Sequence, residues 1–585
     1  MMRRALVLAA LALLAAAPLV LPQFQVTLLN YIGLASIVTL GLVLLTGIGG
    51  LISFGQAAFV GVGAYATAVL TTKVGMSPWL TLPAGLAVTL VVSLFLGFIT
   101  LRLSGHYLPL GTIAWGIAIY FVFGNLDFLG KYSGLAGIPP LTVLGWRLGD
   151  ERAFYYLIWA ITLLALLVTR NLLDSRNGRA IRALRNRGMM AENFGVDTAR
   201  LKIIIFVYAA LLAAVSGWLY AHLLRFVSPQ PFGINDSIDY QFMAVIGGAT
   251  ELWGAVIGAA LLTLLKAWLR DLLPRLMEQS GNFEIIVFGL LVIVMLHRTR
   301  DGLVPYFARL IPTPAQRLPK KVPPLPPRTQ PKRDESLLQL KGVSKSFGAL
   351  AAVKSLSFDM RSGEILGLIG PNGAGKSTVF NLMTGVLAAD AGEICFRGKR
   401  VDNLPGRDIA RCGLARTYQH VHLVPSMSVL DNAAIGAHLR GREGVLSASL
   451  RLDRAEEARL RQEAACRLDW VGLGAHLFEA AGTLPLGSQR MVEIARALCA
   501  DPLLLLLDEP AAGLRYLEKQ TLAKLLFSLR ERGVSILLVE HDMEFVMGLV
   551  DRIVVMNFGE KLAEGSPREI QSSPEVIEAY LGSVE

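Results

Sequence analysis

The sequence predicts a multi-domain protein in which an all-α polytopic membrane domain is followed by an α/β P-loop domain. Up to about residue 300 the chain is almost continuously apolar, whereas beyond residue 335 it alternates like a soluble protein. A glycine-rich phosphate-binding motif lies in that second half. We therefore expect a membrane domain at 1–310, a linker at 311–334 and a soluble domain at 335–585.

The apolar half contains candidate membrane spans. A crossing helix needs about 20 mostly apolar residues. Stretches of this kind are 5–22, 26–47, 51–72, 79–101, 107–127, 153–169, 203–224, 243–266 and 284–297. Because Lys and Arg are enriched on the cytoplasmic side, Arg3 and Arg4 place the N-terminus inside, and six crossings return the chain to the cytoplasm at Arg170. The first stretch also has the pattern of a secretory signal, but the apolar segments that follow at once favour a first span.

The end of the apolar half departs from simple crossings. If every stretch crossed, residue 298 would lie outside, although the basic tail and soluble domain beyond it belong inside. We therefore expect one stretch to be re-entrant or interfacial, and 243–266, which is glycine-rich and holds Glu251, is the candidate. Glycine-rich 49–70 holds Gln56. For these polar residues a role in a transport pathway and a role in helix packing both stay open.

Charge and cysteine usage narrow the class of protein. The net charge is +11, and the surplus basic residues lie mainly at 170–202 and 298–333, beside apolar runs. This pattern favours membrane topology over a nucleic-acid face, and since no basic patch is interleaved with aromatic residues we predict no nucleic-acid partner. The four cysteines all lie in the soluble half without metal-type spacing, which predicts free thiols in a reducing cytosol.

A proline-rich segment separates the two halves. Residues 312–331 read "PTPAQRLPKKVPPLPPRTQP", with eight prolines. Such a segment does not hold a helix and behaves as a semi-rigid extended spacer. We interpret it as a tether.

The stretch "GEILGLIGPNGAGKSTVFNLMTG" (363–385) reads as an apolar strand, a glycine loop and a helix. Its core matches G-x-x-x-x-G-K-[ST] in the context that this motif demands. Backbone N–H groups of such a loop, together with the helix N-terminus, bind phosphate oxygens. We expect Lys376 to reach the β/γ-phosphates and the Ser377 hydroxyl to ligate Mg²⁺. The predicted nucleotide-binding residues here are Gly370, Asn372, Gly373, Gly375, Lys376, Ser377 and Thr378.

A second motif contains two adjacent acidic residues. "PLLLLLDEP" (502–510) is a leucine strand that ends in two carboxylates. Asp508 suits the Mg²⁺ shell of a P-loop enzyme, and Glu509 is placed to polarise an attacking water. These motifs alone fit a helicase, a kinase or a transporter motor equally well.

The soluble half resembles an ATP-binding cassette (ABC) domain along its whole length. "LPLGSQRMVEIARAL" (484–498) resembles the cassette signature, "ARTYQH" (415–420) the Q-loop, and "LLVEHD" (537–542) the switch-histidine region. The resemblance implies that ATP and Mg²⁺ are the cofactors, that Gln419 couples nucleotide to the membrane partner and ligates the metal, and that His541 contacts the γ-phosphate. It further implies nucleotide contacts by Phe347, which would stack on the base, and by Gly487, Ser488 and Gln489 of the signature.

Two positions depart from the cassette pattern. The signature has Pro485 where the family usually has a serine, so this position offers no hydroxyl to a phosphate. Arg515 stands where a shorter Asn or Asp is usual. We hypothesise that one ATP site of a two-cassette motor is weaker for this reason.

Longer stretches resemble the branched-chain amino acid importers. In the soluble half these are "ARTYQHVHLVPSMSVLDN", "LDEPAAGL" and the ending "PEVIEAYLG", and in the membrane half "GGLISFGQAAFVGVGAYATAVL", "GLAGIPP" and "AVIGGATELWGAVIGAALL". The resemblance implies a permease fused to a cassette in the cytoplasmic (inner) membrane, with the ATPase inside. It also implies ATP-driven import, a second permease, a second cassette, an extracytoplasmic solute-binding protein and contact with membrane lipid.

The basic loop "RNGRAIRALRNRGMMAENFG" (176–195) is expected to meet a cassette, because permeases of this class present a short cytoplasmic helix to one. Glu192 and Gly195 fall at the corresponding place. We expect a helix that starts near Ser175, ends at Gly188 and carries its arginines on a solvated face. The alternative is that these arginines only determine topology.

Three other functions remain as rivals: an exporter, a membrane-anchored regulatory ATPase, and an importer of a different small solute such as an amide, urea or an aromatic acid. Short loops disfavour the exporter, and the many polar-dotted spans disfavour a mere anchor.

Overall fold

The structure is a computed structural model and describes residues 2–101, 107–143, 145–276, 283–298, 302–304, 318 and 322–581. The chain forms two compact units. The first comprises Met1–Leu172 and Ala199–Pro314, and the second comprises Leu173–Thr198 and Ala315–Glu585. The basic loop between two apolar helices therefore belongs to the same unit as the soluble part. Most of residues 311–321, within the expected linker, lies outside the described residues.

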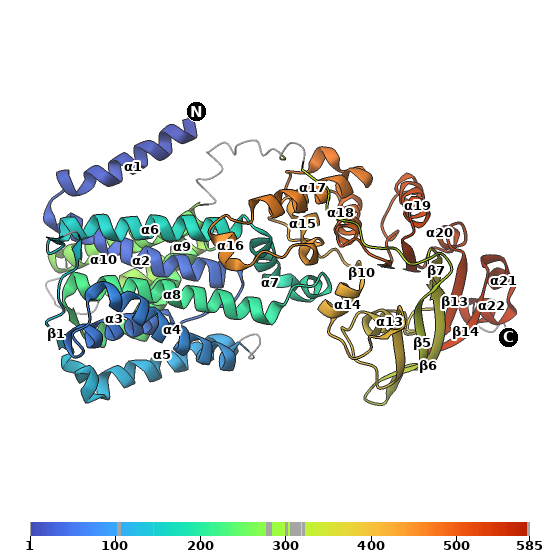
Figure 1. Cartoon of the computed structure of the whole chain (residues 1–585), viewed down its shortest axis with the longest axis horizontal. Coiled ribbons are helices and arrows are strands. Elements are labelled where there is room, and N and C mark those ends of the chain that lie inside the picture. Colours follow the sequence, from blue (N-terminus) through green and yellow to red (C-terminus); the bar gives the residue numbers. More distant parts are fainter. Residues whose placement is uncertain are drawn as a thin grey trace. The chain divides into compact units, whose positions relative to one another are not determined.

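The first unit is helical, and its long helices run alongside one another (Figure 1). Its helices are α1 (Met2–Val20), α2 (Gln23–Leu42), which continues as the π-helix η1 (Val43–Ile48), α3 (Gln56–Thr72), α4 (Pro78–Thr100), α5 (Tyr107–Asn125), α6 (Glu151–Leu173), α8 (Thr198–Leu224), α9 (Ile234–Gly248), α10 (Leu252–Leu276) and α11 (Phe283–Arg298). Two short antiparallel pairs, β1 (Leu135–Ala136) with β4 (Phe226–Val227) and β2 (Thr142–Val143) with β3 (Trp146–Arg147), accompany them.

Six helices of the described residues are long and apolar enough to cross a membrane. They span Gln23–Ile48, Pro78–Thr100, Tyr107–Asn125, Glu151–Leu173, Thr198–Leu224 and Leu252–Leu272. The expected all-α polytopic membrane domain is confirmed. The stretch 51–72 forms a shorter helix, because residues 50–55 are non-helical and α3 begins only at Gln56.

The stretch 243–266, which we expect to be re-entrant or interfacial, is divided between two helices. The backbone breaks after Gly248, and α10 begins at Leu252 as a helix of spanning length. Glu251 lies in the turn between α9 and α10, where its backbone N–H donates to the Gly248 carbonyl at 3.0 Å. The glycines serve close packing there: a Cβ on Gly258 would lie 1.8 Å from the Met243 carbonyl oxygen, so α9 and α10 approach backbone to backbone.

The second unit contains two sheets. A four-stranded antiparallel sheet has the order β6 (Leu350–Arg361), β5 (Ser336–Phe347), β8 (Ala391–Phe396) and β9 (Lys399–Arg400). A six-stranded sheet has the order β10 (Leu414–Arg416), β11 (Leu504–Asp508), β12 (Ser535–Val539), β7 (Ile365–Ile369), β13 (Arg552–Asn557) and β14 (Glu560–Gly565). All its pairs are parallel except β13 with β14.

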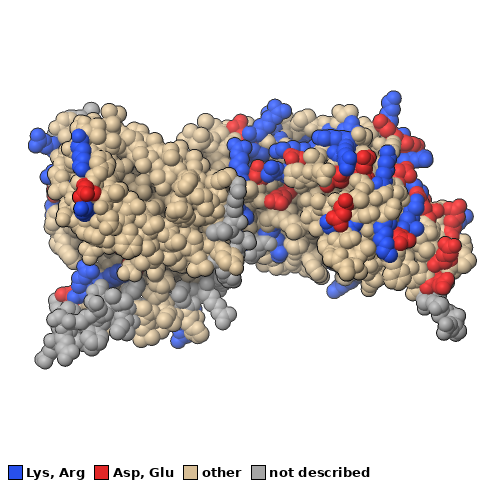
Figure 2. All heavy atoms as spheres, turned by 90° about the horizontal axis from the view of Figure 1, so that it is seen from below, with Lys and Arg blue, Asp and Glu red and all other residues tan. Residues whose placement is uncertain are grey.

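Helices complete the second unit. They are α7 (Arg176–Asn193), α13 (Lys376–Met383), α14 (Gly406–Cys412), α15 (Val429–Ile435), α16 (Val445–Ser449), α17 (Arg454–Trp470), α18 (Leu486–Cys499), α19 (Tyr516–Glu531), α20 (Met543–Met547), α21 (Pro567–Ser572) and α22 (Pro574–Leu581). Together with the sheets they form the expected α/β P-loop domain. Charged side chains gather over this unit, whereas the visible face of the first unit is mainly uncharged (Figure 2).

Continuous apolar runs explain the central strands. All five residues of β7, β11 and β12 are buried in each strand, as expected for parallel strands covered on both faces. Because the carboxyl ends of these strands meet at one edge of the sheet, the residues that follow them are brought together there. The four cysteines are free thiols, as predicted.

Candidate functional site

The glycine loop connects β7 to α13. Gly375 precedes the helix with φ +99°, and a Cβ on it would lie 2.4 Å from the Ala352 carbonyl oxygen, so this position requires glycine. Lys376 is buried, and its Nζ donates to the carbonyl oxygens of Gly370 at 2.7 Å and Pro371 at 3.0 Å. The lysine thus binds the loop's own carbonyls. Burial lowers the pKa of Lys376, and the nearby Glu509 and Asp508 oppose that effect.

The other P-loop residues line the same turn. Asn372 and Gly373 are exposed, Gly373 in a left-handed conformation, and Ser377 is exposed in the first turn of α13, followed by the half-buried Thr378. Exposed backbone donors at a helix N-terminus are suited to bind phosphate oxygens. The structure therefore leaves the predicted phosphate-binding loop accessible.

Three predicted catalytic side chains meet at Glu509. The Gln419 Nε2 donates to Glu509 Oε2 at 3.0 Å, and His541 Nε2 lies 2.9 Å from Glu509 Oε1. Glu509 itself has φ +47°, a strained conformation for a residue other than glycine. Strand order explains the meeting: Glu509 follows β11, while Gln419 and His541 follow the neighbouring strands β10 and β12. Each carboxylate oxygen thus has one partner that orients it.

Asp508 ends β11 beside Glu509 and forms an ion pair with Arg416 of β10. The Arg416 Nη2 lies 3.0 Å from Asp508 Oδ2, and both side chains are 5% exposed. Burial raises the pKa of Asp508, and Arg416 opposes this rise.

A magnesium ion fits the chemistry of the predicted donor groups. Mg²⁺ prefers oxygen ligands and is commonly bound through one or two carboxylates plus the phosphates of the substrate. The Asp508 carboxylate, the Ser377 hydroxyl and the Gln419 amide supply oxygen donors of this kind. When bound, the ion would neutralise phosphate charge, and these three residues would hold it.

Phe347 ends β5 and is 47% exposed. The Nζ atom of Lys345 lies 5.9 Å from the centroid of the Phe347 ring. An exposed aromatic face next to a cation is available to stack on a nucleotide base.

The signature residues open α18, with Pro485 as N-cap. Gln489 Nε2 donates locally to the Leu484 carbonyl at 2.8 Å, and Gly487 and Ser488 are partly exposed. A Cβ on Gly487 would lie 3.1 Å from Glu518 Oε1, so α18 and α19 approach closely at this point. The helix begins at Leu486, directly after the proline.

Arg515 is the N-cap of α19, and its backbone N–H donates to Glu518 Oε2 at 2.8 Å. Arg515, which differs from the family pattern, therefore lies at the N-terminus of α19, where the Glu518 side chain accepts from its backbone. The hypothesis of a weaker ATP site stays a prediction.

The basic loop forms α7 and contacts the cassette through α14, α15 and α16. Its start is confirmed, since Ser175 is the N-cap and its side chain accepts from the Gly178 N–H. The helical conformation breaks at Arg187, where φ is −135°, next to the predicted end at Gly188, and a second helical segment continues to Asn193. The prediction that this loop contacts the cassette is confirmed.

The expectation that the arginines of α7 lie on a solvated face is wrong for two of them. Arg179 is 2% exposed and donates to both oxygens of Glu457 on α17, with 3.0 Å between Nη2 and Oε2. Arg176 donates to the carbonyl oxygens of Gly441 at 2.9 Å and Glu443 at 2.7 Å. These acceptors come from a distant part of the chain, so the loop's own sequence could not reveal them.

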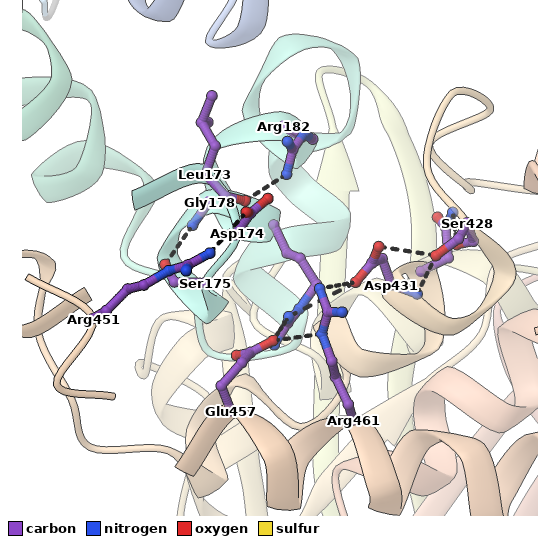
Figure 3. Close-up of polar contacts among 12 residues, drawn as sticks. Leu173, Asp174, Ser175, Gly178, Arg182, Ser428, Asp431, Arg451, Glu457 and Arg461 are labelled. Atoms are coloured by element: carbon purple, nitrogen blue, oxygen red, sulfur yellow. Dashed lines mark hydrogen bonds and ion pairs between the residues drawn. The ribbon is translucent and has the colours of Figure 1, made fainter. Parts of the chain in front are cut away.

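Figure 3 shows polar contacts around the start of α7 and the neighbouring cassette residues. Glu457 and Asp431 point toward Arg461 of α17, which lies 2.9 Å from Glu457 and 3.2 Å from Asp431. At the start of α7, Arg451 lies 3.6 Å from Asp174. Charges of both signs therefore alternate across this contact.

The C-terminal end of α7 meets the Q-loop and the signature helix. Asn193 donates its amide to the Tyr418 hydroxyl. Phe194 is buried, with the Arg496 guanidinium 5.2 Å from its ring centroid. Gly195 has φ +84°, and a Cβ on it would lie 2.2 Å from Leu439 Cγ. Glu192 accepts a hydrogen bond from Thr198 and thus closes the loop on itself.

Sequence reasoning missed several residues of this site. Arg490 of α18 donates to the Glu509 carbonyl at 2.7 Å and to the Gln419 carbonyl at 3.3 Å, so the signature helix supports the backbone at both of these predicted site residues. Arg416 and Tyr418 flank the Q-loop in "ARTYQH". The available signal was their position beside Gln419 in this stretch.

Family models match three parts of the chain. Residues 24–296 match the branched-chain amino acid transport system / permease component, residues 353–512 match the ABC transporter model, and residues 560–585 match the branched-chain amino acid ATP-binding cassette transporter model.

Characterised relatives cover the cassette part. The chain is 44% identical over 251 residues to the high-affinity branched-chain amino acid transport ATP-binding protein LivG of Salmonella typhimurium, which covers 42% of this chain and 98% of that protein. It is 41% identical over 249 residues to the corresponding protein BraF of Pseudomonas aeruginosa, again with 42% and 98% covered. A crystal structure of a nucleotide-free ATP-binding cassette from an ABC transporter is 30% identical, covers 43% of this chain and all of that one, and has a TM-score of 0.39.

The fold and the site define an ABC transporter chain whose ATPase cassette is joined to a multi-pass membrane part. The chain belongs to the branched-chain amino acid transport family of ABC transporters, with a permease and an ATP-binding cassette in one polypeptide. Its cassette is an ABC-type ATPase that binds ATP.

Proposed function

We propose that this chain imports branched-chain amino acids, or closely related amino acids, at the expense of ATP. The observation that carries the proposal is the docking of α7 on the cassette. A helix that follows α6, of membrane-spanning length, places Arg179 beside Glu457 and Asp431 of the ATPase, so one polypeptide supplies both a membrane path and its motor. The permease match and the LivG likeness support the solute class.

The same proposal assigns roles at the nucleotide. Lys376 and the loop from Gly370 to Thr378 bind the phosphates, Phe347 stacks on the base, and Ser377, Gln419 and Asp508 hold Mg²⁺. Glu509 accepts a proton from the attacking water, and His541 holds that carboxylate while contacting the γ-phosphate. The Gln419–Glu509–His541 contacts support this assignment, because they orient one carboxylate from both sides.

The assembly requires further subunits. Gly487, Ser488 and Gln489 are proposed to complete the ATP site of a second cassette, as they form local contacts at the start of α18. A second permease and an extracytoplasmic solute-binding protein complete the importer. We place the membrane part at 1–310 in the inner membrane, the linker at 311–334, and the cassette at 335–585 in the cytoplasm, since the basic residues of 170–202 mark the inner side.

Within the permease, Gln56 is the proposed pathway residue. It is fully buried, and neither its amide oxygen nor its amide nitrogen has a hydrogen-bond partner among the described residues. Unsatisfied buried amides are costly, which supports a functional use. Glu251 is the second candidate from the sequence, at the exposed turn before α10.

The test is uptake of labelled leucine, isoleucine and valine by cells that lack this chain, complemented with wild type or with Glu509→Gln. Restored uptake with wild type only supports the proposal. ATPase activity without uptake of these three, but with uptake of an amide, urea or an aromatic acid, would replace the solute class. ATPase activity without any uptake would leave a membrane-anchored regulatory ATPase.

A further inference from the structure

Arg416 joins the end of β10 to three separate groups of the cassette. Its guanidinium donates to Asp508 at 3.0 Å, to Asn381 Oδ1 at 2.7 Å and to Thr384 Oγ1 at 3.2 Å. The guanidinium also lies 5.4 Å from the ring centroid of Phe380. Arg416 is therefore the resident counter-ion of the carboxylate that is expected to ligate Mg²⁺.

Tyr418, two residues on, links the same strand end to α7. The Arg416 guanidinium lies 5.2 Å from the Tyr418 ring centroid. The Tyr418 hydroxyl accepts from the Asn193 amide and donates to the Met189 carbonyl at 3.4 Å.

These contacts form a continuous chain from the nucleotide site to α7. Asp508, Arg416, Tyr418 and Asn193 follow one another without a gap. Because Asp508 and Arg416 are almost fully buried, either charge without a partner would carry a large desolvation cost. A new cation at Asp508 therefore changes where the Arg416 guanidinium is most stable.

We propose that Arg416 is a positioning residue that exchanges Asp508 for other partners when Mg²⁺–ATP enters, and that Tyr418 passes this displacement to Asn193 and Met189 of α7. The inference rests on the proposed function, because it assumes that Asp508 serves the metal. It adds Arg416 and Tyr418, which act through other groups rather than on the substrate. Tyr418 contacts Arg416 through its ring and α7 through two hydrogen bonds. A change at either neighbour therefore affects the position of Tyr418.

The experiment uses the full chain in its assembled transporter, in a Glu509→Gln background that retains ATP. A fluorescent label on Met189→Cys, after the native cysteines are replaced by serine, reports the surroundings of α7 during titration with Mg²⁺ and ATP. Equilibrium ATP binding in the same samples gives the Mg²⁺ concentration for half-saturation. Neither readout depends on turnover.

Arg416→Gln removes the competing cation, and we expect half-saturation at about tenfold lower Mg²⁺ together with loss of the label response. Arg416→Lys keeps the charge and should restore part of both. Tyr418→Phe keeps the ring but removes the hydroxyl, so half-saturation should stay unchanged while the label response is lost. The controls are Arg411→Gln and Tyr516→Phe, which alter exposed side chains.

An unchanged label response in Tyr418→Phe would overturn the transmission to α7, and unchanged Mg²⁺ half-saturation in Arg416→Gln would overturn the exchange at Asp508. If Arg416→Gln does not fold, Tyr418→Phe still decides the transmission. Failure of the proposed function is distinguishable, because a chain that imports no amino acid can still show both responses.

Discussion

Arg179 of α7 and Glu457 of α17 form a two-point hydrogen-bonded ion pair although they lie 278 positions apart in the chain. The side chains are 2% and 13% exposed. Asp431 lies 3.8 Å from the same guanidinium, and desolvation by burial is outweighed by these acids, so the pKa of Arg179 is raised. A buried pair of this kind adds little stability over an apolar pair, but it penalises any misplacement of either partner. It therefore determines where α7 docks.

Arg179→Ala should destabilise the docked state by about 3–5 kcal/mol, because Glu457 would stay buried without its cation. We expect a lower midpoint of thermal unfolding and loss of leucine uptake. In a double-mutant cycle, Arg179→Ala with Glu457→Ala should cost less than the sum of the single changes. Arg459→Ala on the exposed face of α17 is the control. Additive single effects would contradict a direct interaction.

Gly195→Ala should impair the coupling of ATP binding to uptake, although it adds only one methyl group. The residue has φ +84°, and the new Cβ would overlap Leu439. We expect reduced uptake with ATP binding preserved, and partial recovery with Leu439→Ala. Recovery should be incomplete, because a left-handed alanine still costs about 1–2 kcal/mol. Gly188→Ala is the matched control, as nothing lies within 4 Å of its Cβ position.

Glu509→Gln should lower the rate of ATP hydrolysis by about 10²–10⁴-fold, since the base that accepts the water's proton is lost. ATP binding should persist. His541→Ala should lower the rate by a smaller factor, because Gln419 still holds one oxygen of Glu509. Single-turnover hydrolysis and equilibrium binding measure the two quantities separately. A Glu509→Gln enzyme with the wild-type rate would exclude this glutamate as the base.

A lower pH should reduce the stability of the folded cassette through His438. Burial and the nearby Arg176 and Arg179 lower the pKa of His438 to about 3. The unfolded histidine takes up a proton near pH 6.5, whereas the folded one does not. The contribution of His438 to the free energy of unfolding is therefore complete above about pH 6.5 and is lost as the pH falls toward 3. Thermal midpoints between pH 7 and pH 5 should fall less in His438→Gln than in wild type, with His476→Gln as the surface control. Parallel curves would contradict the prediction.

Local patterns were sufficient for much of the fold and of the nucleotide site. The leucine run before Asp508 could only be a buried parallel strand, and the spacing from Gly370 to Lys376 placed the phosphate loop between a strand and a helix. Neighbouring strand ends then bring Gln419, Glu509 and His541 together, a consequence of parallel order. The expected spans at 26–47, 79–101, 107–127, 153–169 and 203–224 coincide with helices of spanning length, since length and hydropathy are properties of contiguous residues.

Distant residues determine two features that composition does not show. The stretch 243–266 has the composition of one apolar segment, yet the backbone breaks before Leu252, where glycines of α9 and α10 pack against each other's backbone. The arginines of α7 have the pattern of a solvated face, but their partners lie more than 250 residues away. Neither set of neighbours can be read from a local window.

The sequence by itself determined the chemistry and the order of the parts: helices with a membrane-spanning pattern, a tether, a phosphate loop and its acids. Only the tertiary structure decided which charged and polar side chains meet. Asp508 with Arg416, Tyr418 with Asn193, and Glu457 with Arg179 are pairs formed across long chain separations. The physical reason is that motif residues act through contiguous backbone geometry, whereas buried charges depend on whichever partners the folded chain brings within a few ångströms.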